Sequence, residues 1–591
     1  MDAVCKKTLT RCAAMASYQL LVRHGKISKP GERSGFARSS PLSAADPALS
    51  SPPLPAYNTA GRCHFPKGAA MNEQQSTKDH ADTETAVSAA EGLLRAALPQ
   101  LLPGMSLTQR EARAASLIGQ IQTDIERDWN GVPKIQREES LARGKALRKV
   151  LSRRQLGTWD VIPDRIDGAA RVLAQDAGRV PDLIPVRHER MCSSPFAFFR
   201  GAAAVMAADL GGGPGTGIPV QACGDAHIAN FGIFASPERR LVFDINDFDE
   251  TIRAPWEWDV KRLCASAEIC GRDRGFSRQA RAAAVYAAAD SYRDAMQRFS
   301  SMGTLDVWYT HADLENLLRE GKKHALTDES RRQMQKAMEK ALTRSREEAM
   351  QKLTERVDGH VQIRSNPPLV VPFRDMAEPD EMGYAGDRAS EFLTFALKKY
   401  RMSLPRERRY LIDQYSVSDA ARKVVGVGSV GTRCWIVVME GNSRHDPLIL
   451  QIKEARHSVL EPYVEKSPYP EQSRRVIEGQ RAIQTAGDIL SGWLWFPDRT
   501  GRIMDYYVRQ LWDSKGSVDL SRTDPEEFSG YCALCGWTLA HAHAKTGNRH
   551  KIAGYLGKGD AFPEAMQRFA SSYADQNEAD FAAFCKAVSG A

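Results

Sequence analysis

The stretch "ARKVVGVGSVGTRCWIVVMEGNSRHDPLILQIKEA", residues 421–455, contains Gly426, Gly428 and Gly431 in the spacing G-x-G-x-x-G. Dinucleotide-binding folds use this spacing at the start of a helix, whose N-terminus holds a pyrophosphate. Here the residues that follow, "TRCWIVVME", are rich in β-branched and apolar side chains, which favours a strand over a helix. We therefore predict two strands joined by a glycine-rich loop.

Lys453 lies some 22 residues after the last of these glycines, in the apolar segment "LILQIKEA". Backbone N–H groups of a glycine-rich hairpin loop can cover nucleotide phosphates, and a lysine on a nearby strand can reach them. The candidate nucleotide-binding residues are therefore Gly426, Gly428, Ser429, Gly431 and Lys453. The alternative is an ordinary hairpin with an exposed lysine.

A second polar segment, "QACGDAHIANFG" (221–232), places Asp225 and Asn230 five residues apart among small and apolar neighbours. Phosphoryl transfer requires a carboxylate that orients the acceptor hydroxyl, and Mg²⁺ prefers carboxylate and amide oxygens over imidazole. Asp225 is thus the candidate catalytic base and Asn230 a candidate metal ligand, whereas His227 is expected to brace the loop. The alternative is a pair of turn-forming residues.

A third segment, "VFDINDFDE" (242–250), places Asp244, Asp247 and Asp249 after an apolar strand. Three carboxylates so close together repel one another unless a cation or solvent relieves them. The pattern therefore favours a metal site, with an exposed acidic turn as the alternative.

The charge of the chain is concentrated near its start. Of the formal net charge of +8, the first 70 residues contribute most, with ten Lys/Arg against three Asp/Glu. The rest is nearly neutral, so charge does not indicate a nucleic-acid partner. No run of 18 apolar residues occurs, which argues against a membrane span. The eleven cysteines lack the spacing of a disulfide framework and favour a reducing compartment, the cytoplasm.

Hydrophobic periodicity predicts an α+β chain. Residues 1–70 are rich in Ser, Pro, Ala and Arg and are expected to be disordered; a transit peptide or a translation start at Met71 are alternatives. The expected elements are helices over about 85–210, strands over 217–250, helices over 256–400, strands over 421–455, a helix over 473–486, a strand pair over 493–512 and a helix over 531–547.

Two of these motifs resemble a known superfamily. "CGDAHIAN" (223–230) is similar to the "HGDLHPGN" loop of aminoglycoside and choline phosphotransferases, which are protein-kinase-like. "INDFDETIRAPWEWDVKRL" (245–263) resembles their metal-binding segment, and alignment on Trp258–Asp259 brings Asp247 onto the metal-ligand aspartate. Cys223 is a departure, since those enzymes have histidine there.

Over about 150–585 the chain closely resembles an uncharacterised bacterial family catalogued as domain of unknown function 2252. The resemblance rests on long segments such as "IPVRHERMCSSPFAFFRGAAAVMAADL" (184–210), "RKVVGVGSVGTRCW" (422–435) and "YYVRQLWDSKGS" (506–517). That family brings no established activity, only a proposed kinase-like relationship.

The order of the motifs is inverted relative to a kinase, in which the glycine-rich loop and lysine come first. Circular permutation would preserve the site, because chain ends often lie close together on a surface. The resemblance then implies that Glu478, in the helix after Lys453, pairs with that lysine. It also requires Lys453 to lie within about 15 Å of Asp247, since both must meet one nucleotide–metal complex.

These inferences predict a protein-kinase-like, two-lobed fold in which the catalytic lobe precedes the nucleotide lobe. The expected regions are a tail (1–70), a helical region (71–190), a catalytic region (191–405), a nucleotide-binding region (406–525) and C-terminal helices that complete the catalytic lobe (526–591). The expected activity is an ATP- and Mg²⁺-dependent phosphotransferase acting on a small-molecule hydroxyl, with neither a nucleic acid nor a membrane as partner. The alternatives are a non-catalytic nucleotide-binding scaffold and a nucleotidyl (AMP) transferase.

Overall fold

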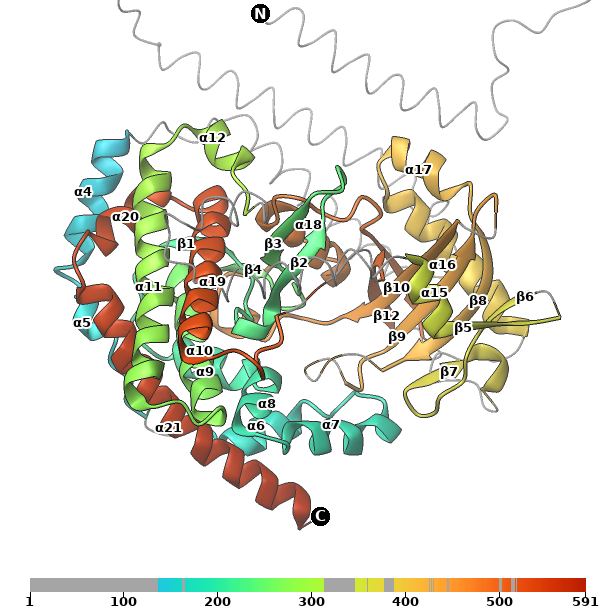
Figure 1. Cartoon of the computed structure of the whole chain (residues 1–591), viewed down its shortest axis with the longest axis horizontal. Helices are drawn as coiled ribbons and strands as arrows, with labels where there is room; N and C mark the ends of the chain where they lie inside the picture. Colours follow the sequence, from blue (N-terminus) through green and yellow to red (C-terminus); the bar gives the residue numbers. More distant parts are fainter. Residues whose placement is uncertain are drawn as a thin grey trace, which may run out of the picture. The chain divides into compact units, whose positions relative to one another are not determined.

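The computed structural model describes residues 136–161, 165–312, 346–358, 360–376, 387–424, 426, 428, 430–443, 446–498, 502–511, 516 and 518–590. The chain divides into two units, 1–81 and 82–591, and every described element belongs to the second. The predicted tail and the predicted helices before residue 136 lie outside the described residues. The described part is a mixed α+β structure, as expected (Figure 1).

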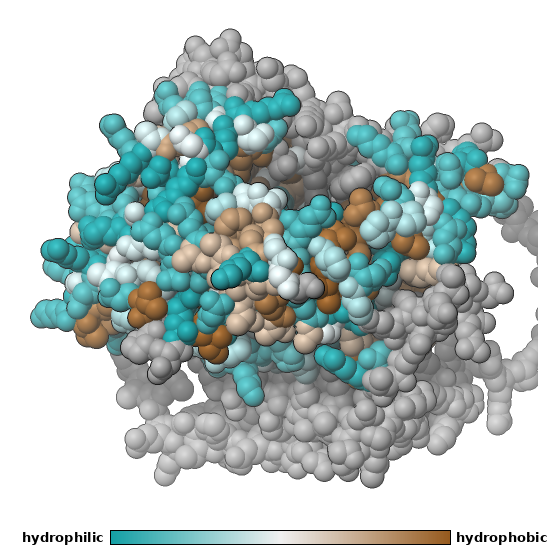
Figure 2. Space-filling model, turned by 90° about the horizontal axis from the view of Figure 1, so that it is seen from below, coloured by the Kyte–Doolittle hydropathy of each residue, from teal (hydrophilic) through white to brown (hydrophobic). Residues whose placement is uncertain are grey.

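The α-helices are α4 (Arg137–Leu147), α5 (Arg153–Leu156), α6 (Gly168–Ala174), α7 (Ile184–Met191), α8 (Pro195–Gly201), α9 (Ala203–Gly211), α10 (Trp256–Asp273), α11 (Arg278–Ser301), α12 (Thr304–Tyr309), α15 (Arg346–Leu353), α16 (Asp387–Ser403), α17 (Arg406–Ile412), α18 (Gln472–Ile483), α19 (Pro525–Thr546), α20 (Arg549–Leu556) and α21 (Ala561–Ser589). Among these helices, none combines the length and apolarity that crossing a membrane requires. On the face drawn in Figure 2, hydrophobic residues lie in groups between hydrophilic ones.

The strands are β1 (Pro219–Ala222), β2 (Phe231–Ala235), β3 (Leu241–Ile245), β4 (Ile252–Pro255), β5 (Thr354–Val357), β6 (His360–Ile363), β7 (Val370–Pro372), β8 (Ser416–Lys423), β9 (Cys434–Glu440), β10 (Pro447–Ala455), β11 (Gly492–Pro497) and β12 (Ile503–Gln510). Short 3₁₀ helices cover Pro181–Leu183, Ile228–Asn230, Phe373–Asp375 and Glu461–Tyr463.

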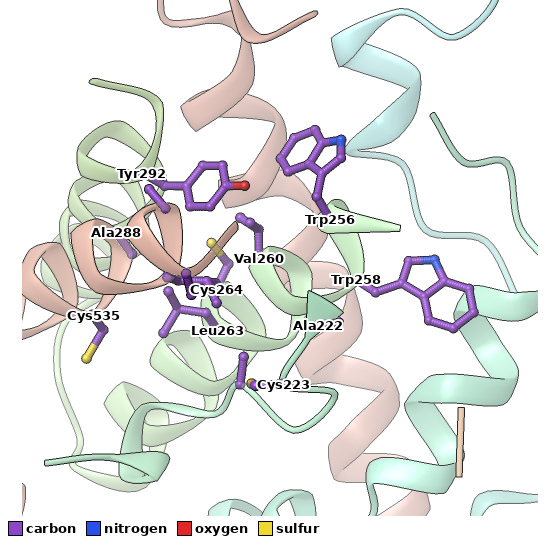
Figure 3. Close-up of a cluster of buried hydrophobic side chains, with 14 of the residues drawn as sticks. Ala222, Cys223, Trp256, Trp258, Val260, Leu263, Cys264, Ala288, Tyr292 and Cys535 are labelled. Atoms are coloured by element: carbon purple, nitrogen blue, oxygen red, sulfur yellow. The ribbon is translucent and has the colours of Figure 1, made fainter. Parts of the chain in front are cut away.

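Helices α10, α11, α19 and α21 pack against one another around an apolar core. The buried Trp256 stacks on Tyr292 of α11, with ring centroids 5.5 Å apart, and both belong to the cluster drawn in Figure 3. A Cβ on Gly536 would lie 2.1 Å from the carbonyl oxygen of Ala288, so α19 and α11 meet backbone to backbone. The last helices of the chain are therefore part of the same core as α10.

A six-stranded antiparallel sheet has the order β11-β12-β10-β9-β8-β7. In β9 the side chains alternate between two faces, as a strand requires. Trp435 and Val437 pack in one core with residues of α16, whereas Ile436 and Val438 pack in another with residues of β6. The predicted hairpin around the glycine-rich loop and the predicted strand pair β11–β12 are both confirmed.

Strands β5 to β7 correct the prediction of continuous helices over 256–400. β5 pairs with β6, and β7 joins the edge of the six-stranded sheet through β8. The sequence "TERVDGHVQIRSNPPLVVPF" (354–373) has an Asp-Gly turn signal and β-branched residues, and Asp358 has a φ of 50°. This short hairpin was not predicted because the apolar residues on either side of it have helical spacing. Its β-strands are stabilised by packing beside the sheet.

Two small antiparallel pairs bring the polar segments together. β1 pairs with β4 through Ala222 and Ile252, and β2 pairs with β3 through Phe231 and Ile245. The Asp225 loop (223–230) connects β1 to β2, and the Asp247 loop (246–251) connects β3 to β4. Because the strands on both sides are paired, the two loops lie side by side.

Candidate active site

A cavity of about 570 Å³ lies where the Asp225 loop, the Asp247 loop and the glycine-rich loop (424–433) meet. The glycine-rich loop is far in the sequence from the other two loops, and pairing of β10 with β9 and β12 places Lys453 at the same cavity. The predicted site residues in its walls are Asp225, Asn230, Asp247, Asp249, Gly426, Gly428 and Lys453.

Asp225 is held by a buried arginine. Nε of Arg262 donates to Oδ1 of Asp225 at 2.5 Å, while Nη2 donates to the carbonyl oxygen of Phe199 at 2.9 Å. The second carboxylate oxygen, Oδ2, lies 3.7 Å from Nε2 of His227. Burial lowers the pKa of His227 to about 4 although the charge of Asp225 opposes the shift, so the imidazole is neutral at pH 7. Arg262 is therefore the cation that is bonded to the Asp225 carboxylate.

The backbone of the Asp225 loop is fixed from α10. The buried carboxylate of Asp259 accepts hydrogen bonds from the N–H groups of Cys223 and Gly224, at 2.8 and 3.0 Å. Nε2 of His543 lies 3.2 Å from the same carboxylate, and its Nδ1 lies 2.8 Å from the hydroxyl of Tyr292. Since hydrogen bonds to a buried carboxylate are strong, Asp259 fixes the loop from α10.

Gly224 allows the two loops to touch. Its φ is 81°, a value that L-residues rarely adopt, and a Cβ there would lie 2.4 Å from the carbonyl oxygen of Glu250. Nδ2 of Asn230 ties the same two loops, because it donates to the carbonyl oxygens of Asp225 at 2.9 Å and of Asp247 at 3.3 Å. Both amide hydrogens are thus used by backbone, and Oδ1 remains as the acceptor atom of Asn230.

Lys453 meets two aspartates on the floor of the cavity. Its ammonium lies 3.6 Å from Oδ2 of Asp247 and forms a hydrogen-bonded ion pair with Oδ2 of Asp249. The hydroxyl of Tyr507 donates to the other oxygen of Asp249 at 2.6 Å. The required proximity of Lys453 and Asp247 is therefore met.

The pKa values of Lys453, Asp247 and Asp249 are shifted by the charges of these three residues on one another. Desolvation lowers the pKa of Lys453, but the charges of Asp247 and Asp249 outweigh it and raise that pKa well above its usual value. Desolvation and the charge of Asp249 raise the pKa of Asp247. Desolvation also acts to raise the pKa of Asp249, but the charge and hydrogen bond of Lys453 outweigh it and lower that pKa. Two carboxylates thus share one ammonium.

Asp244 corrects the predicted set of metal ligands. Its buried carboxylate accepts the backbone N–H groups of Ile245, at 2.8 Å, and of Thr485, at 3.1 Å. Burial raises its pKa to about 6, against those two hydrogen bonds. Asp244 lies within β3 and its side chain meets the backbone of Thr485, whereas Asp247 lies in the loop that follows the strand. In the residues that the structure describes, no three His, Cys, Asp or Glu side chains form a group that could hold a metal.

Glu478 is also a correction. Nη1 of Arg481 lies 3.4 Å from its carboxylate, one helical turn away in α18, whereas Lys453 pairs with Asp247 and Asp249. The expected pairing of Glu478 with Lys453 is therefore replaced by a local one. Arg475 of α18 reaches the Asp247 loop instead, where its Nη2 donates to the carbonyl oxygen of Asp249 at 2.8 Å.

The glycine-rich loop is braced from the segment before α7. The carbonyl oxygen of Gly431, whose φ is 84°, accepts the backbone N–H of Val180 at 2.8 Å. Nη1 of Arg179 donates to the carbonyl oxygens of Gly428 at 3.3 Å and Val430 at 2.5 Å. Ser429, a candidate phosphate-binding residue, lies outside the described residues.

Several polar residues of the site were missed at the sequence level: Arg179, Arg262, Tyr507 and Arg509. A helical reading of α10 could have found Arg262, because it lies three residues after Asp259 and so on the same side of the helix. Strand alternation could have found Tyr507 and Arg509, which pair with Lys453 and Gln451 in the sheet. Arg179 carries no sequence signal of this kind.

The family model that matches this chain is described as "Uncharacterized protein conserved in bacteria (DUF2252)", and the match covers residues 179–587. No curated protein and no solved structure matches the chain. The matched span contains all three loops, Lys453, Asp259 and the helices that pack around them. The chain therefore belongs to the bacterial family DUF2252.

Proposed function

We propose that this chain is a kinase-like phosphotransferase that uses ATP and Mg²⁺ to phosphorylate a hydroxyl group of a small molecule. The observation that carries the proposal is the meeting of Lys453 and Asp247, whose Nζ and Oδ2 atoms lie 3.6 Å apart although about 200 residues separate them. A kinase site needs a lysine for the nucleotide phosphates and an aspartate for the metal within reach of one ligand.

The arrangement of the sheet supports this proposal. In a kinase the glycine-rich loop covers the phosphates, the lysine is on the third strand and the helix that follows supplies a glutamate. Here the loop joins β8 to β9, Lys453 is on β10 and α18 comes next. The Asp225 and Asp247 loops precede this sheet, and α19 returns to pack on α11. A circular permutation of a kinase-like chain accounts for this order.

Asp225 would orient the acceptor. Because Arg262 binds Oδ1, the oxygen that can accept a hydrogen bond from a substrate hydroxyl is Oδ2. Oδ2 would take up the hydroxyl proton as the hydroxyl oxygen forms a bond to the terminal phosphorus of ATP, while the bond from that phosphorus to the bridging oxygen breaks and ADP leaves. The neighbouring His227, whose pKa is lowered to about 4 by burial, is not a base suited to neutral pH.

Gly426, Gly428 and Lys453 would hold the phosphates of the nucleotide. The lining also includes Val424 and Leu511, apolar residues that directly follow β8 and β12, against which a base can pack. A cavity with both polar and apolar lining residues suits a nucleoside triphosphate.

The residues present also suit Mg²⁺. The candidate ligands are Asp247, Asp249 and the Oδ1 atom of Asn230, all oxygen donors. The Asp247 side chain is 38% exposed, and desolvation together with the charge of Asp249 raises its pKa, so a second cation would relieve this pair. Bound Mg²⁺ neutralises charge on transferring phosphates.

Thermal unfolding of the full chain with Mg²⁺ and ATP tests the proposal. We expect ATP to raise the unfolding midpoint only when Mg²⁺ is present, and Asp247→Asn to abolish that rise. Asp375→Asn, at a side chain that is 39% exposed and outside the cavity, is the matched control and should keep it. An unchanged response in both Asp247→Asn and Lys453→Ala would refute the assignment of the nucleotide site.

Isotope-labelled ATP separates phosphoryl transfer from the two alternatives. Label on the terminal phosphate should move to an acceptor or to water in the wild type and not in Asp225→Asn. Transfer of an α-phosphate label to an acceptor, with the terminal label released in pyrophosphate, would indicate a nucleotidyl transferase. Metal-dependent binding with no loss of either label would indicate a non-catalytic nucleotide-binding protein.

A further inference from the structure

Arg200 lies near the end of α8 and in the wall of the cavity. A Cβ on Gly428 would lie 3.5 Å from the carbonyl oxygen of Arg200, so this residue is next to the glycine-rich loop. Burial lowers the pKa of Arg200 and the charge of Asp225 opposes that shift, while the charge of Arg200 contributes to the lowered pKa of His227. Its guanidinium is therefore close to the Asp225 loop.

The guanidinium of Arg200 lacks a partner. Its Nε is buried without a hydrogen-bond partner, and the contacts of the described residues include no hydrogen bond or ion pair to its guanidinium. Other arginines in the same wall are bonded, since Arg179 donates to Val430, Arg456 to Glu454 and Arg509 to Gln451. Asp225, the acid whose charge acts to raise the pKa of Arg200, is already bound by Arg262.

An arginine in this state costs free energy, because a guanidinium stays charged and its buried Nε–H group has lost its bond to water. Binding of a carboxylate or a phosphate offsets this free-energy cost best, since two oxygens of the anion can accept hydrogen bonds from the planar guanidinium. Because Arg200 and Asp225 line the same cavity, such an anion would lie in the cavity that contains the carboxylate proposed to orient the acceptor hydroxyl.

We propose that Arg200 binds an oxyanion, a phosphate or a carboxylate, of the acceptor substrate. This inference rests on the proposed function, and it narrows the acceptor to hydroxylated acids and phosphorylated metabolites, excluding neutral alcohols and sugars. Arg200 holds the anion while Asp225 orients a hydroxyl group of the same molecule. The terminal phosphate of ATP offers the same chemistry, and the experiment separates the two sources.

The test uses inorganic phosphate as the probe and calorimetric titration of the full chain. Wild type, Arg200→Gln and the control Arg278→Gln, at an exposed position in α11, are compared at constant ionic strength. We expect Arg200→Gln to raise the Kd for phosphate about tenfold or more, the loss of one or two charge-assisted hydrogen bonds. Arg278→Gln should leave it unchanged.

A second measurement distinguishes binding from a structural role. Without ligand, Arg200→Gln should unfold at the same temperature as the wild type or at a higher one, because the guanidinium has no partner to lose. A lower midpoint with unchanged phosphate affinity would overturn the inference and make Arg200 a structural residue.

The source of the anion is decided with a non-hydrolysable ATP analogue and Mg²⁺. If the acceptor supplies it, phosphate binds in the presence of the analogue, and Arg200→Gln leaves the Kd of the analogue within about twofold. If the analogue displaces phosphate and Arg200→Gln weakens the analogue but not ADP, the acceptor assignment is overturned. If phosphate binding depends on Arg200 but the wild type binds no nucleotide, the anion site is supported and the proposed function fails.

Discussion

Replacement of Lys453 with methionine tests the electrostatics of the cavity floor. The substitution keeps the apolar stem but removes the ammonium that lies between Asp247 and Asp249. Removal of one partner from a fully buried ion pair costs about 3–5 kcal/mol. Here the aspartate side chains are 38% and 29% exposed, so water screens part of their charge. We therefore expect the free energy of unfolding to fall by roughly 1–3 kcal/mol at neutral pH.

The loss should depend on pH. In the wild type, desolvation acts to raise the pKa of Asp249, but Lys453 outweighs it and lowers that pKa. Asp249 therefore stabilises the fold at pH values above its unfolded pKa of about 4. This stabilisation is lost only as the pH falls through the lower pKa of the folded state. In Lys453→Met, desolvation is unopposed and the folded pKa of both aspartates rises, so their ionised forms destabilise the fold as pH increases. The difference between the two proteins should thus shrink on acidification.

Urea unfolding of both proteins at several values between about pH 5 and 8, at constant ionic strength, measures this difference. Lys466→Met, at an exposed lysine, is the matched control and should show little loss at any pH. Millimolar Mg²⁺ should stabilise Lys453→Met more than the wild type, because the ion no longer competes with an ammonium. A loss that is independent of pH, or equal to that of the control, would refute the reasoning.

Three further predictions concern the loops and α18. Asp259→Asn removes the charge that accepts two backbone N–H groups, so we expect a loss of about 3 kcal/mol in urea unfolding and reduced turnover of ATP; unchanged stability would show that the loop is held otherwise. Gly224→Ala places an alanine at a φ of 81° and its Cβ against the carbonyl oxygen of Glu250. The free energy of unfolding should therefore fall by at least about 1–2 kcal/mol. A change below about 0.5 kcal/mol would contradict the geometry. Glu478→Gln should change stability by less than about 0.5 kcal/mol and leave the Kd for ATP unchanged, whereas a tenfold weaker Kd would mean that Glu478 meets Lys453 in the nucleotide complex.

Local patterns anticipated much of the fold. The β-branched run after Gly431 predicted the strand that is now β9, and the "PER" turn signal at 237–239 predicted the connection between β2 and β3. These predictions hold because strand and turn preferences act over a few residues. The hairpin β5–β6 was missed because its strands are only four residues long and lie among helical patterns, although the Asp-Gly turn signal was present, and their stability comes from packing beside the sheet.

The chemical identity of the candidate site could be read from residue types, since Asp225, Asn230 and Asp247 are oxygen donors whatever the fold. Which side chains meet depended on pairing over long distances. β10 and the β3–β4 loop are some 200 residues apart, and only their packing decides that Lys453 binds Asp249 and that Glu478 does not reach Lys453. The same holds for Arg200, because a missing partner is a property of three-dimensional surroundings and leaves no trace in sequence spacing.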